Sequence, residues 1–289
     1  MRAFYRKNRW PARLGISAYA LGVLKLSDNY CMKIIGVKEV RMKENGYFLD
    51  LLKLDIEKYP VIAVVGGGGK TSLIYRLSEE LRAKGKKVII TTTTHMAYDP
   101  SLPLIRGNEL EKTSEMLEKT SEMLEKHGYV AVADIEPETG KMCSIEEAEL
   151  KNLAALCDVM LIEADGAKRK PLKVPADWEP VIPDFADVVV SVIGLDCLGK
   201  PICETAHRAE YTSSFLGKNL DAPVTAEDIE KIATSIHGLY KNVDHKIYRV
   251  YLNKADVLTT STEAEHIVED LKKQGTVAAY GSLKEAETL

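Results

Sequence analysis

The chain has 289 residues, of which 45% are hydrophobic and 28% are charged, so it can bury one large core or one core with a small appendage. A formal net charge of −4 and a pI near 6.0 provide no overall basic field, which excludes general recruitment of nucleic acid or of an anionic membrane. Five cysteines without a C-x-x-C pair exclude a disulfide framework and a zinc knuckle, and they are typical of a reducing, cytoplasmic location.

The N-terminal residues differ from the rest of the chain. Several basic side chains precede an apolar run at 14–24, a pattern that resembles a secretory signal peptide. Met32 and Met42 offer alternative starts ahead of the motifs described below, which belong in the cytoplasm. We therefore expect residues 1–45 to be an extension that is poorly ordered or precedes the natural start, and residues 46–289 to form the domain. No stretch reaches the roughly 20 apolar residues of a spanning helix, so we expect no membrane partner.

Short apolar runs alternate with helical patterns along residues 46–289. The first run, 61–65, ends in glycines and is followed by apolar residues at helical spacing from Leu73 to Leu81, which predicts a strand, a glycine loop and a helix. Further buried strands are predicted at 88–90, 129–133, 159–162, 188–193, 247–252 and 277–280. The alternation predicts an α/β, P-loop NTPase-like fold, with a doubly wound, mostly parallel sheet and helices on both faces.

Three of the predicted helices have recognisable boundaries, and a fourth contains a tandem repeat. Ser144-x-x-Glu147 and Thr225-x-x-Asp228 have the spacing of a capping box, and the apolar positions of 264–271 precede Gly275. The heptapeptide EKTSEML occurs twice in tandem over 111–124. Seven residues are almost two helical turns, so the repeat rotates the apolar face by only about 20° and predicts a longer surface helix with no function of its own.

The strongest motif is VVGGGGKTS, which lies between the first strand and the first helix. Its backbone N–H groups can approach phosphate oxygens, the lysine supplies a positive charge, and the threonine hydroxyl can ligate Mg²⁺. The spacing is G-x-x-G-K-T, shorter than the Walker A pattern G-x-x-x-x-G-K-[ST]. A glycine-rich turn with an incidental lysine is the alternative, but the flanking strand and helix favour a phosphate loop. The loop residues are Gly66, Gly67, Gly68, Gly69, Lys70, Thr71 and Ser72.

An acidic pair follows the strand predicted at 159–162. The segment VMLIEADG places Glu163 and Asp165 at the carboxyl end of that strand, where open α/β sheets bind ligands and where a carboxylate can hold Mg²⁺. Glu163-x-x-Gly166 also fits a D-x-x-G switch loop in which Glu replaces Asp. Acidic strand ends are common, but next to a glycine loop this one predicts a Mg²⁺ site, with Lys70, Glu163 and Asp165 as catalytic residues.

A third motif points to the base of the nucleotide. Asn253-Lys254-Ala255-Asp256 ends the strand at 247–252 and has the form N-K-x-D, by which G proteins recognise guanine. A carboxylate can accept two hydrogen bonds from N1–H and the 2-amino group of guanine, and adenine offers neither donor in that arrangement. We therefore predict that Asn253, Lys254 and Asp256 bind the base of GTP, with ATP as the alternative.

Two further segments predict a second site. ITTTTHM places Thr93 and His95 after a strand, where they could meet phosphate, Mg²⁺ or substrate; a solvated strand end is the alternative. The basic loop behind Gly166 could clamp an anionic cofactor, although such loops are usually only solvated. With two residues of HRAE, its cations make up the candidate set Lys168, Arg169, Lys170, Lys173, His207 and Arg208.

These motifs also resemble a known family. GGGGKTS, TTTTHM, EADGAKRKPLKVPADWEPVIP, VIGLDCLGKP, HRAE and NKAD, in this order, resemble the YqeC family of selenium-dependent hydroxylase accessory proteins. The resemblance covers residues 46–289. It implies a role in maturing molybdenum hydroxylases of the xanthine dehydrogenase type, at a step that involves selenium or the pterin cofactor, with the client hydroxylase or its pterin cofactor as partner. It does not specify a reaction.

Three hypotheses fit the sequence. The first is a slow, Mg²⁺-dependent NTPase that acts as a maturation factor. The second is a nucleotide-gated binding protein for the pterin cofactor or the client, without significant turnover. The third is an ATP-dependent ligase, because the short G-x-x-G-K-T loop also resembles that of Mur-type ligases, which pass through an acyl phosphate. Turnover with and without a client separates the first two, and an acyl-phosphate product would support the third.

Overall fold

A computed structural model of the chain describes residues 25–26, 29–32, 40–41, 47–110 and 112–284. Its contacts divide the chain into two compact units, Met1–Lys43 and Glu44–Leu289. In the first unit, β1 (Lys25–Leu26), β2 (Asn29–Met32) and β3 (Val40–Arg41) form a small antiparallel sheet with β2 in the middle. Most of the extension expected over residues 1–45 lies outside the described residues.

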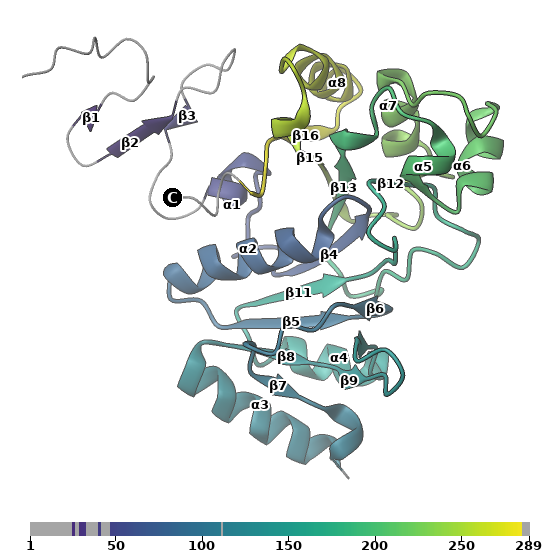
Figure 1. Cartoon of the computed structure of the whole chain (residues 1–289). Coiled ribbons are helices and arrows are strands. Elements are labelled where there is room, and N and C mark those ends of the chain that lie inside the picture. Colours follow the sequence, from purple (N-terminus) through teal and green to yellow (C-terminus); the bar gives the residue numbers. More distant parts are fainter. Residues whose placement is uncertain (1–24, 27–28, 33–39, 42–46, 111, 285–289) are drawn as a thin grey trace, which may run out of the picture. The chain divides into compact units, whose positions relative to one another are not determined.

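The second unit is built on an eight-stranded sheet in which each strand runs parallel to its neighbours (Figure 1). The strand order is β16-β15-β13-β4-β11-β5-β8-β7. Every apolar run predicted as a strand lies in this sheet. The strands are β4 (Val61–Gly66), β5 (Val88–Thr92), β7 (Leu104–Ile105), β8 (Tyr129–Val132), β11 (Val159–Glu163), β13 (Val188–Gly194), β15 (Ile247–Asn253) and β16 (Val277–Tyr280).

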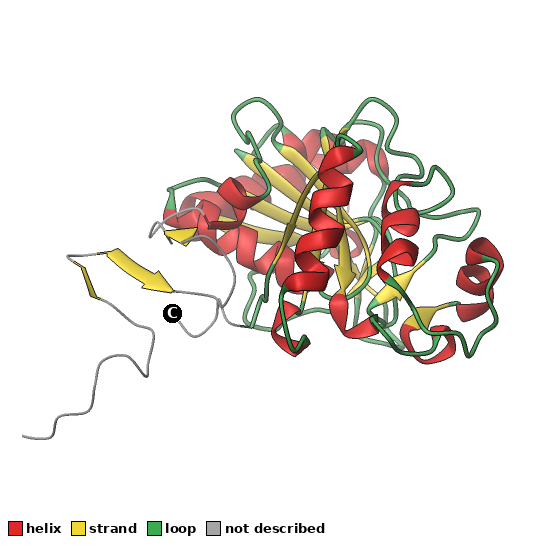
Figure 2. Ribbon diagram, turned by 90° about the horizontal axis from the view of Figure 1, so that it is seen from above, coloured by secondary structure: helices red, strands yellow, loops and turns green. Residues whose placement is uncertain are grey.

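Helices cover both faces of the sheet, as the view from above shows (Figure 2). Because successive side chains of a strand point to opposite faces, Ile62 and Val64 pack with the helices of one face, and Ala63 and Val65 pack with those of the other. The first face carries α1 (Tyr47–Leu51) and α2 (Lys70–Ala83), and the second carries α3 (Thr113–His127), α4 (Glu147–Ala154), α7 (Ala226–Thr234) and α8 (Thr262–Lys273). The predicted doubly wound α/β fold is confirmed.

Two helix starts test the predicted capping boxes. The box at α7 is confirmed: the Thr225 hydroxyl accepts a hydrogen bond from the Asp228 N–H at 3.4 Å, and the Asp228 carboxylate accepts one from the Thr225 N–H at 2.9 Å. The box at α4 is wrong, because that helix begins at Glu147 after Glu146 as its N-cap. The Ser144 hydroxyl donates to the adjacent Ile145 carbonyl at 2.6 Å, a local bond that competes with capping.

The tandem repeat lies mostly in α3, as predicted, and there Met116, Thr120 and Leu124 form one buried stripe. Among the described residues, no helix is long and apolar enough to cross a membrane. The short elements are β6 (His95–Met96), η1 (Gly107–Glu109), β9 (Asp134–Ile135), β10 (Met142–Cys143), β12 (Leu172–Lys173), η2 (Leu195–Cys197), α5 (Ile202–Thr205), β14 (Ala206–His207), α6 (Ala209–Leu216) and η3 (Ala255–Val257).

A buried carboxylate joins α1 to α2. Glu80 of α2 accepts hydrogen bonds from the N–H groups of Phe48 at 2.9 Å and Leu49 at 3.2 Å, which lie at the start of α1. Burial raises the pKa of Glu80, and the two backbone N–H groups oppose this shift. The carboxylate thus satisfies two backbone donors that no helical carbonyl can reach.

We expect Glu80→Ala to lower the free energy of unfolding by about 1–3 kcal/mol, because two buried N–H groups lose their acceptor. The matched control is Glu79→Ala on the same helix, whose side chain is 60% exposed. It should stay within about 0.5 kcal/mol of the unmodified protein. Urea unfolding followed by circular dichroism measures both, and equal losses would show that the contact with α1 adds nothing.

Candidate functional site

Parallel strands bring the candidate residues to one edge of the sheet. The central strands β13, β4 and β11 are neighbours, and β15 lies beside β13. Their carboxyl ends carry Gly194, the glycine loop at 66–69, Glu163 and Asn253, respectively. The next strand of this sheet along the chain, β5, lies on one side of β4, and the later strand β13 lies on the other side. The glycine loop therefore lies at the switch point of the sheet, where α/β proteins bind ligands.

The glycine loop leaves no room for side chains. A Cβ on Gly68 would lie 2.3 Å from the backbone nitrogen of Gly194, and one on Gly69 would lie 2.4 Å from the Asn253 amide nitrogen. The φ angles of Gly68 and Gly69, +75° and +135°, are also in the region that favours glycine. The run of glycines is thus required by the close approach of β13, β15 and the segment at Lys170 and Pro171 to the loop.

Lys70 and the backbone at the start of α2 offer donors at this loop. The Lys70 side chain is buried, and its Nζ donates to the Gly66 carbonyl at 3.0 Å and lies 3.6 Å from Glu163 Oε1. Within the described part of the chain, the N–H groups of 69–72 have no hydrogen-bond acceptor. Four such groups at the start of a helix carry partial positive charge, and this arrangement suits a phosphate.

The two predicted carboxylates have different surroundings. Glu163 Oε2 accepts a hydrogen bond from the Thr71 hydroxyl at 2.6 Å, so two hard oxygen ligands of the kind that Mg²⁺ prefers meet here. Burial raises the pKa of Glu163, against the opposing charge of Lys70. Asp165 instead accepts the Gly66 N–H at 3.2 Å and pairs with Lys173. Its oxygens are already occupied, so the structure favours Glu163 over Asp165 as the metal ligand.

The N-K-x-D segment lies against the glycine loop. Asn253 donates from its side-chain nitrogen to the Gly68 carbonyl at 2.7 Å, and its side-chain oxygen accepts the Leu283 N–H at 3.1 Å. Lys254 pairs with Asp196 at 2.7 Å. Asp256 follows in η3 and is exposed. The structure therefore brings together two predicted motifs that are far apart in the sequence.

Two residues at this edge were missed in the sequence. Asp196 follows β13 and Ser282 follows β16. Among the described residues, neither Oδ1 of Asp196 nor the hydroxyl of Ser282 has a hydrogen-bond partner, although both atoms are buried. A buried polar atom without a partner calls for an explanation, and a bound ligand is one. Their positions just after predicted strands could have identified both.

Part of the predicted second site comes together. Lys173 of β12 is in register with His207 of β14, and Arg208 follows directly. Lys173 is fully buried, however, and pairs with Asp165 and Glu179, so it is not a solvent-facing cation. Burial lowers the pKa of His207 to about 4, and the charges of Lys173 and Arg208 add to this effect. The imidazole is therefore neutral at neutral pH.

The other predicted second-site residues either contact different groups or are exposed. The Thr93 hydroxyl donates to the Val181 carbonyl at 2.6 Å, and the exposed His95 lies 3.5 Å from Glu136 Oε1. Lys170 donates to the Glu204 carbonyl at 2.6 Å. Its neighbours Lys168 and Arg169 are exposed. Only these last two of the predicted cations therefore face solvent freely.

Comparison with known proteins assigns the family. A family model described as YqeC protein matches residues 62–210, which include the glycine loop, Glu163 and the basic loop. The chain is 31% identical over 242 residues to the uncharacterized protein YqeC of Escherichia coli (strain K12), covering 81% of this chain and 92% of the relative. The chain belongs to the YqeC family. The N-K-x-D segment of the present chain lies beyond residues 62–210, the range that the family model matches.

Two solved structures are also similar to the YqeC chain. One is the hydrogenase maturation factor HypB of Archaeoglobus fulgidus, with 15% identity, a TM-score of 0.35, and coverage of 78% of this chain and 83% of that chain. The other is a GTPase in its apo form from Pyrococcus abyssi, with 14% identity, a TM-score of 0.34, and coverage of 78% and 91%. Similarity this distant carries no argument about function.

The close packing of Gly68 is testable with a matched glycine. Gly85 has nearly the same φ, +74° against +75°, but apart from its chain neighbours no atom of the described residues lies within 4 Å of the place that a Cβ would take there. We expect Gly85→Ala to cost only the left-handed backbone penalty of about 1–2 kcal/mol. Gly68→Ala should cost about 1–3 kcal/mol more, because the new methyl group overlaps β13. Thermal unfolding of both variants measures the difference, and equal costs would mean that the loop can move away from β13.

Proposed function

We propose that this YqeC protein binds GTP with Mg²⁺ at the glycine loop and hydrolyses it slowly. The contact between the Thr71 hydroxyl and Glu163, at 2.6 Å, carries the proposal. It lies beside a helix start whose N–H groups are open and beside the buried Lys70. A triphosphate at this place would meet positive charge and backbone donors on one side, and Mg²⁺ ligands on the other.

The chain's own residues would divide the work. Lys70 would exchange the Gly66 carbonyl for phosphate oxygens, and Thr71 with Glu163 would hold Mg²⁺. The bound Mg²⁺ would neutralise the negative charge that develops on the phosphates. Because Lys70 and Glu163 are both buried, their charges act with little screening by water.

The choice of GTP rests on the position of the N-K-x-D segment. Asn253 fixes this segment to the loop through the Gly68 carbonyl, so a nucleotide whose phosphates occupy the loop has Asp256 on the same edge. The buried hydroxyl of Ser282, on the adjacent strand end, is an additional group for the base. This arrangement supports guanine, whose donors a carboxylate can accept.

The wider role that we propose is the one that the motif resemblance implies. We propose that the protein assists maturation of selenium-dependent molybdenum hydroxylases, with the client or its pterin cofactor as partner. Chemistry on the thiols of Cys197 and Cys203 is not favoured, because the reactive form of cysteine is the thiolate. Burial raises the pKa of Cys197 to about 12, and the pKa of Cys203 is also raised. Nucleotide-dependent binding is therefore the contribution that we propose.

Removal of the loop lysine tests nucleotide binding. We expect Lys70→Ala to abolish calorimetric binding of Mg²⁺ with a non-hydrolysable GTP analogue, because each charge-assisted hydrogen bond is worth about 1.5–3 kcal/mol. Lys84→Ala, an exposed lysine just after the same helix, is the control and should bind as the unmodified protein does. Unchanged affinity in Lys70→Ala would refute a phosphate loop here.

Base choice is tested at Asp256. If its carboxylate accepts both N1–H and the 2-amino group of guanine, GTP should bind more tightly than ATP, and Asp256→Asn should remove the preference. The loss should be on the order of 1–3 kcal/mol, or about tenfold to a hundredfold in dissociation constant. The variant should gain affinity for xanthosine triphosphate, whose 2-oxo group accepts a bond from the new amide. Equal affinity of the unmodified protein for ATP and GTP would rule out guanine recognition while leaving phosphate binding intact.

A further inference from the structure

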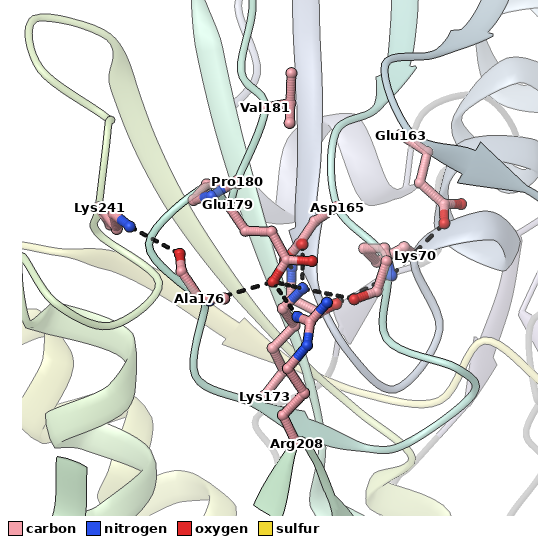
Figure 3. Close-up of polar contacts among 12 residues, drawn as sticks. Lys70, Glu163, Asp165, Lys173, Ala176, Glu179, Pro180, Val181, Arg208 and Lys241 are labelled. Carbon is pink, nitrogen blue, oxygen red and sulfur yellow. Dashed lines mark hydrogen bonds and ion pairs between the residues drawn. The ribbon is translucent and has the colours of Figure 1, made fainter. Parts of the chain in front are cut away.

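A chain of alternating charges leads away from the glycine loop (Figure 3). Asp165 accepts the Gly66 N–H at 3.2 Å and also pairs with Lys173. Lys173 pairs with Glu179 at 2.7 Å, and Glu179 pairs with Arg208. We call Asp165, Lys173, Glu179 and Arg208 the charge chain.

The inner part of the charge chain is buried and saturated with hydrogen bonds. The Lys173 side chain is fully buried, and its three donors reach Asp165, Glu179 and the Gly166 carbonyl. Burial acts to raise the pKa of Glu179, but the bonds from Lys173 and Arg208 outweigh it and the pKa is lowered. Buried ion pairs stabilise a fold little compared with apolar packing. Stability alone therefore does not account for these charges.

The segment 166–173, which carries Lys173, also covers the glycine loop. The Lys170 carbonyl accepts the Gly68 N–H at 3.0 Å, and the Pro171 carbonyl accepts the Gly194 N–H at 2.9 Å. A phosphate entering the loop competes with the Lys170 carbonyl for its donor. It also adds negative charge beside Asp165, which weakens the hold of that carboxylate on the loop. Occupancy of the loop therefore acts on this segment at two points.

The backbone of the same segment is strained. Lys168 and Arg169 have successive φ values of 44° and 61°, in the left-handed region that non-glycine residues rarely adopt. Such a conformation persists only where surrounding contacts hold it, and it is common in switch segments. Loss of the contact with the glycine loop would remove one of the restraints.

The outer end of the charge chain is an exposed aromatic face. The Arg208 guanidinium carbon lies 5.3 Å from the centre of the Trp178 ring. Trp178 is 64% exposed and directly precedes Glu179, so a shift of Glu179 moves both the ring and the cation above it. Aromatic residues and arginine are enriched where proteins meet. The exposed Lys168 is near enough to act electrostatically on His207, which directly precedes Arg208. We call the surface formed by Trp178 and Arg208 the Trp178 face, and its positive charge suits a partner segment that carries carboxylates.

We propose that the charge chain couples nucleotide at the glycine loop to the Trp178 face, so that the face binds an acidic partner segment in one nucleotide state and not in the other. This coupling rests on the proposed function, because it requires a triphosphate in the glycine loop. It goes beyond that function by assigning a binding surface, an acidic partner and control of their contact by the nucleotide.

Trp178 itself is the probe for this coupling. The chain has two tryptophans, so Trp10→Phe in the full-length protein leaves Trp178 as the only one. In that background we expect its emission to change as Mg²⁺ with a non-hydrolysable GTP analogue saturates the site. Arg208→Gln removes the last charge and leaves the buried links in place, and it should lose this change while calorimetric affinity stays within about threefold. Glu179→Gln should lose it as well.

A matched arginine provides the control. Arg82 also lies over an aromatic ring, 3.5 Å from the centre of Tyr129, but at the far end of α2. Arg82→Gln should keep the nucleotide-dependent emission change. A change that survives in full in Arg208→Gln, or bound nucleotide without any change in Trp178 emission, overturns the coupling. Absence of calorimetric binding overturns the proposed function instead, and the coupling with it.

A labelled octaglutamate peptide tests the partner chemistry. We expect its fluorescence anisotropy to report tighter binding in one nucleotide state than in the other, and Arg208→Gln to remove that difference. Octalysine, with the opposite charge, should not bind. Equal octaglutamate affinity with and without nucleotide, or no binding in either state, overturns the acidic-partner assignment of the face.

Discussion

The position of Gly68 is the constraint on which the rest of the site depends. Its N–H donates to the Lys170 carbonyl, its carbonyl accepts from Asn253, and its α-carbon lies so close to Gly194 that no side chain fits. One residue thus joins the segment after β11, the end of β13 and the end of β15. Any group that enters the glycine loop must fit within these contacts or displace one of them. Of the three residues that contact Gly68 here, Lys170 lies in a loop, whereas Asn253 and Gly194 lie at the ends of sheet strands.

The same packing explains why two carboxylates so close in sequence have different roles. Glu163 is the last residue of β11 and faces Thr71 at the start of α2. Asp165 lies beyond the strand, where it reaches under the glycine loop and is neutralised by Lys173. A carboxylate held by a buried ammonium has little affinity left for a metal ion, because its negative charge is already compensated. The acidic pair therefore separates into Glu163, the proposed metal ligand, and Asp165, which holds the glycine loop through the Gly66 N–H.

Much of this fold could be predicted because the strands of a parallel sheet are continuous apolar runs, and those runs are visible in the sequence. The strand β7, Leu104–Ile105, is too short to produce such a run. The role of Lys173 could not be predicted, because a lysine in a basic loop is usually solvated. Its burial depends on Asp165 and on Glu179, whose orientation is set by the fold and by Arg208. Charges that are paired through space leave no pattern in the sequence.

On the part of this sheet edge from β4 to β16, two groups of polar atoms have no hydrogen-bond partner among the described residues. At the start of α2 they are backbone donors, and after β13 and β16 they are an oxygen of Asp196 and the hydroxyl of Ser282. Asn253 connects the two places, because it bonds to the Gly68 carbonyl on one side and to the Leu283 N–H on the other. A simple anion would satisfy only the donors, and a neutral heterocycle only the second group. A ligand with an anionic end and a hydrogen-bonding ring satisfies both, and a nucleotide has this chemistry.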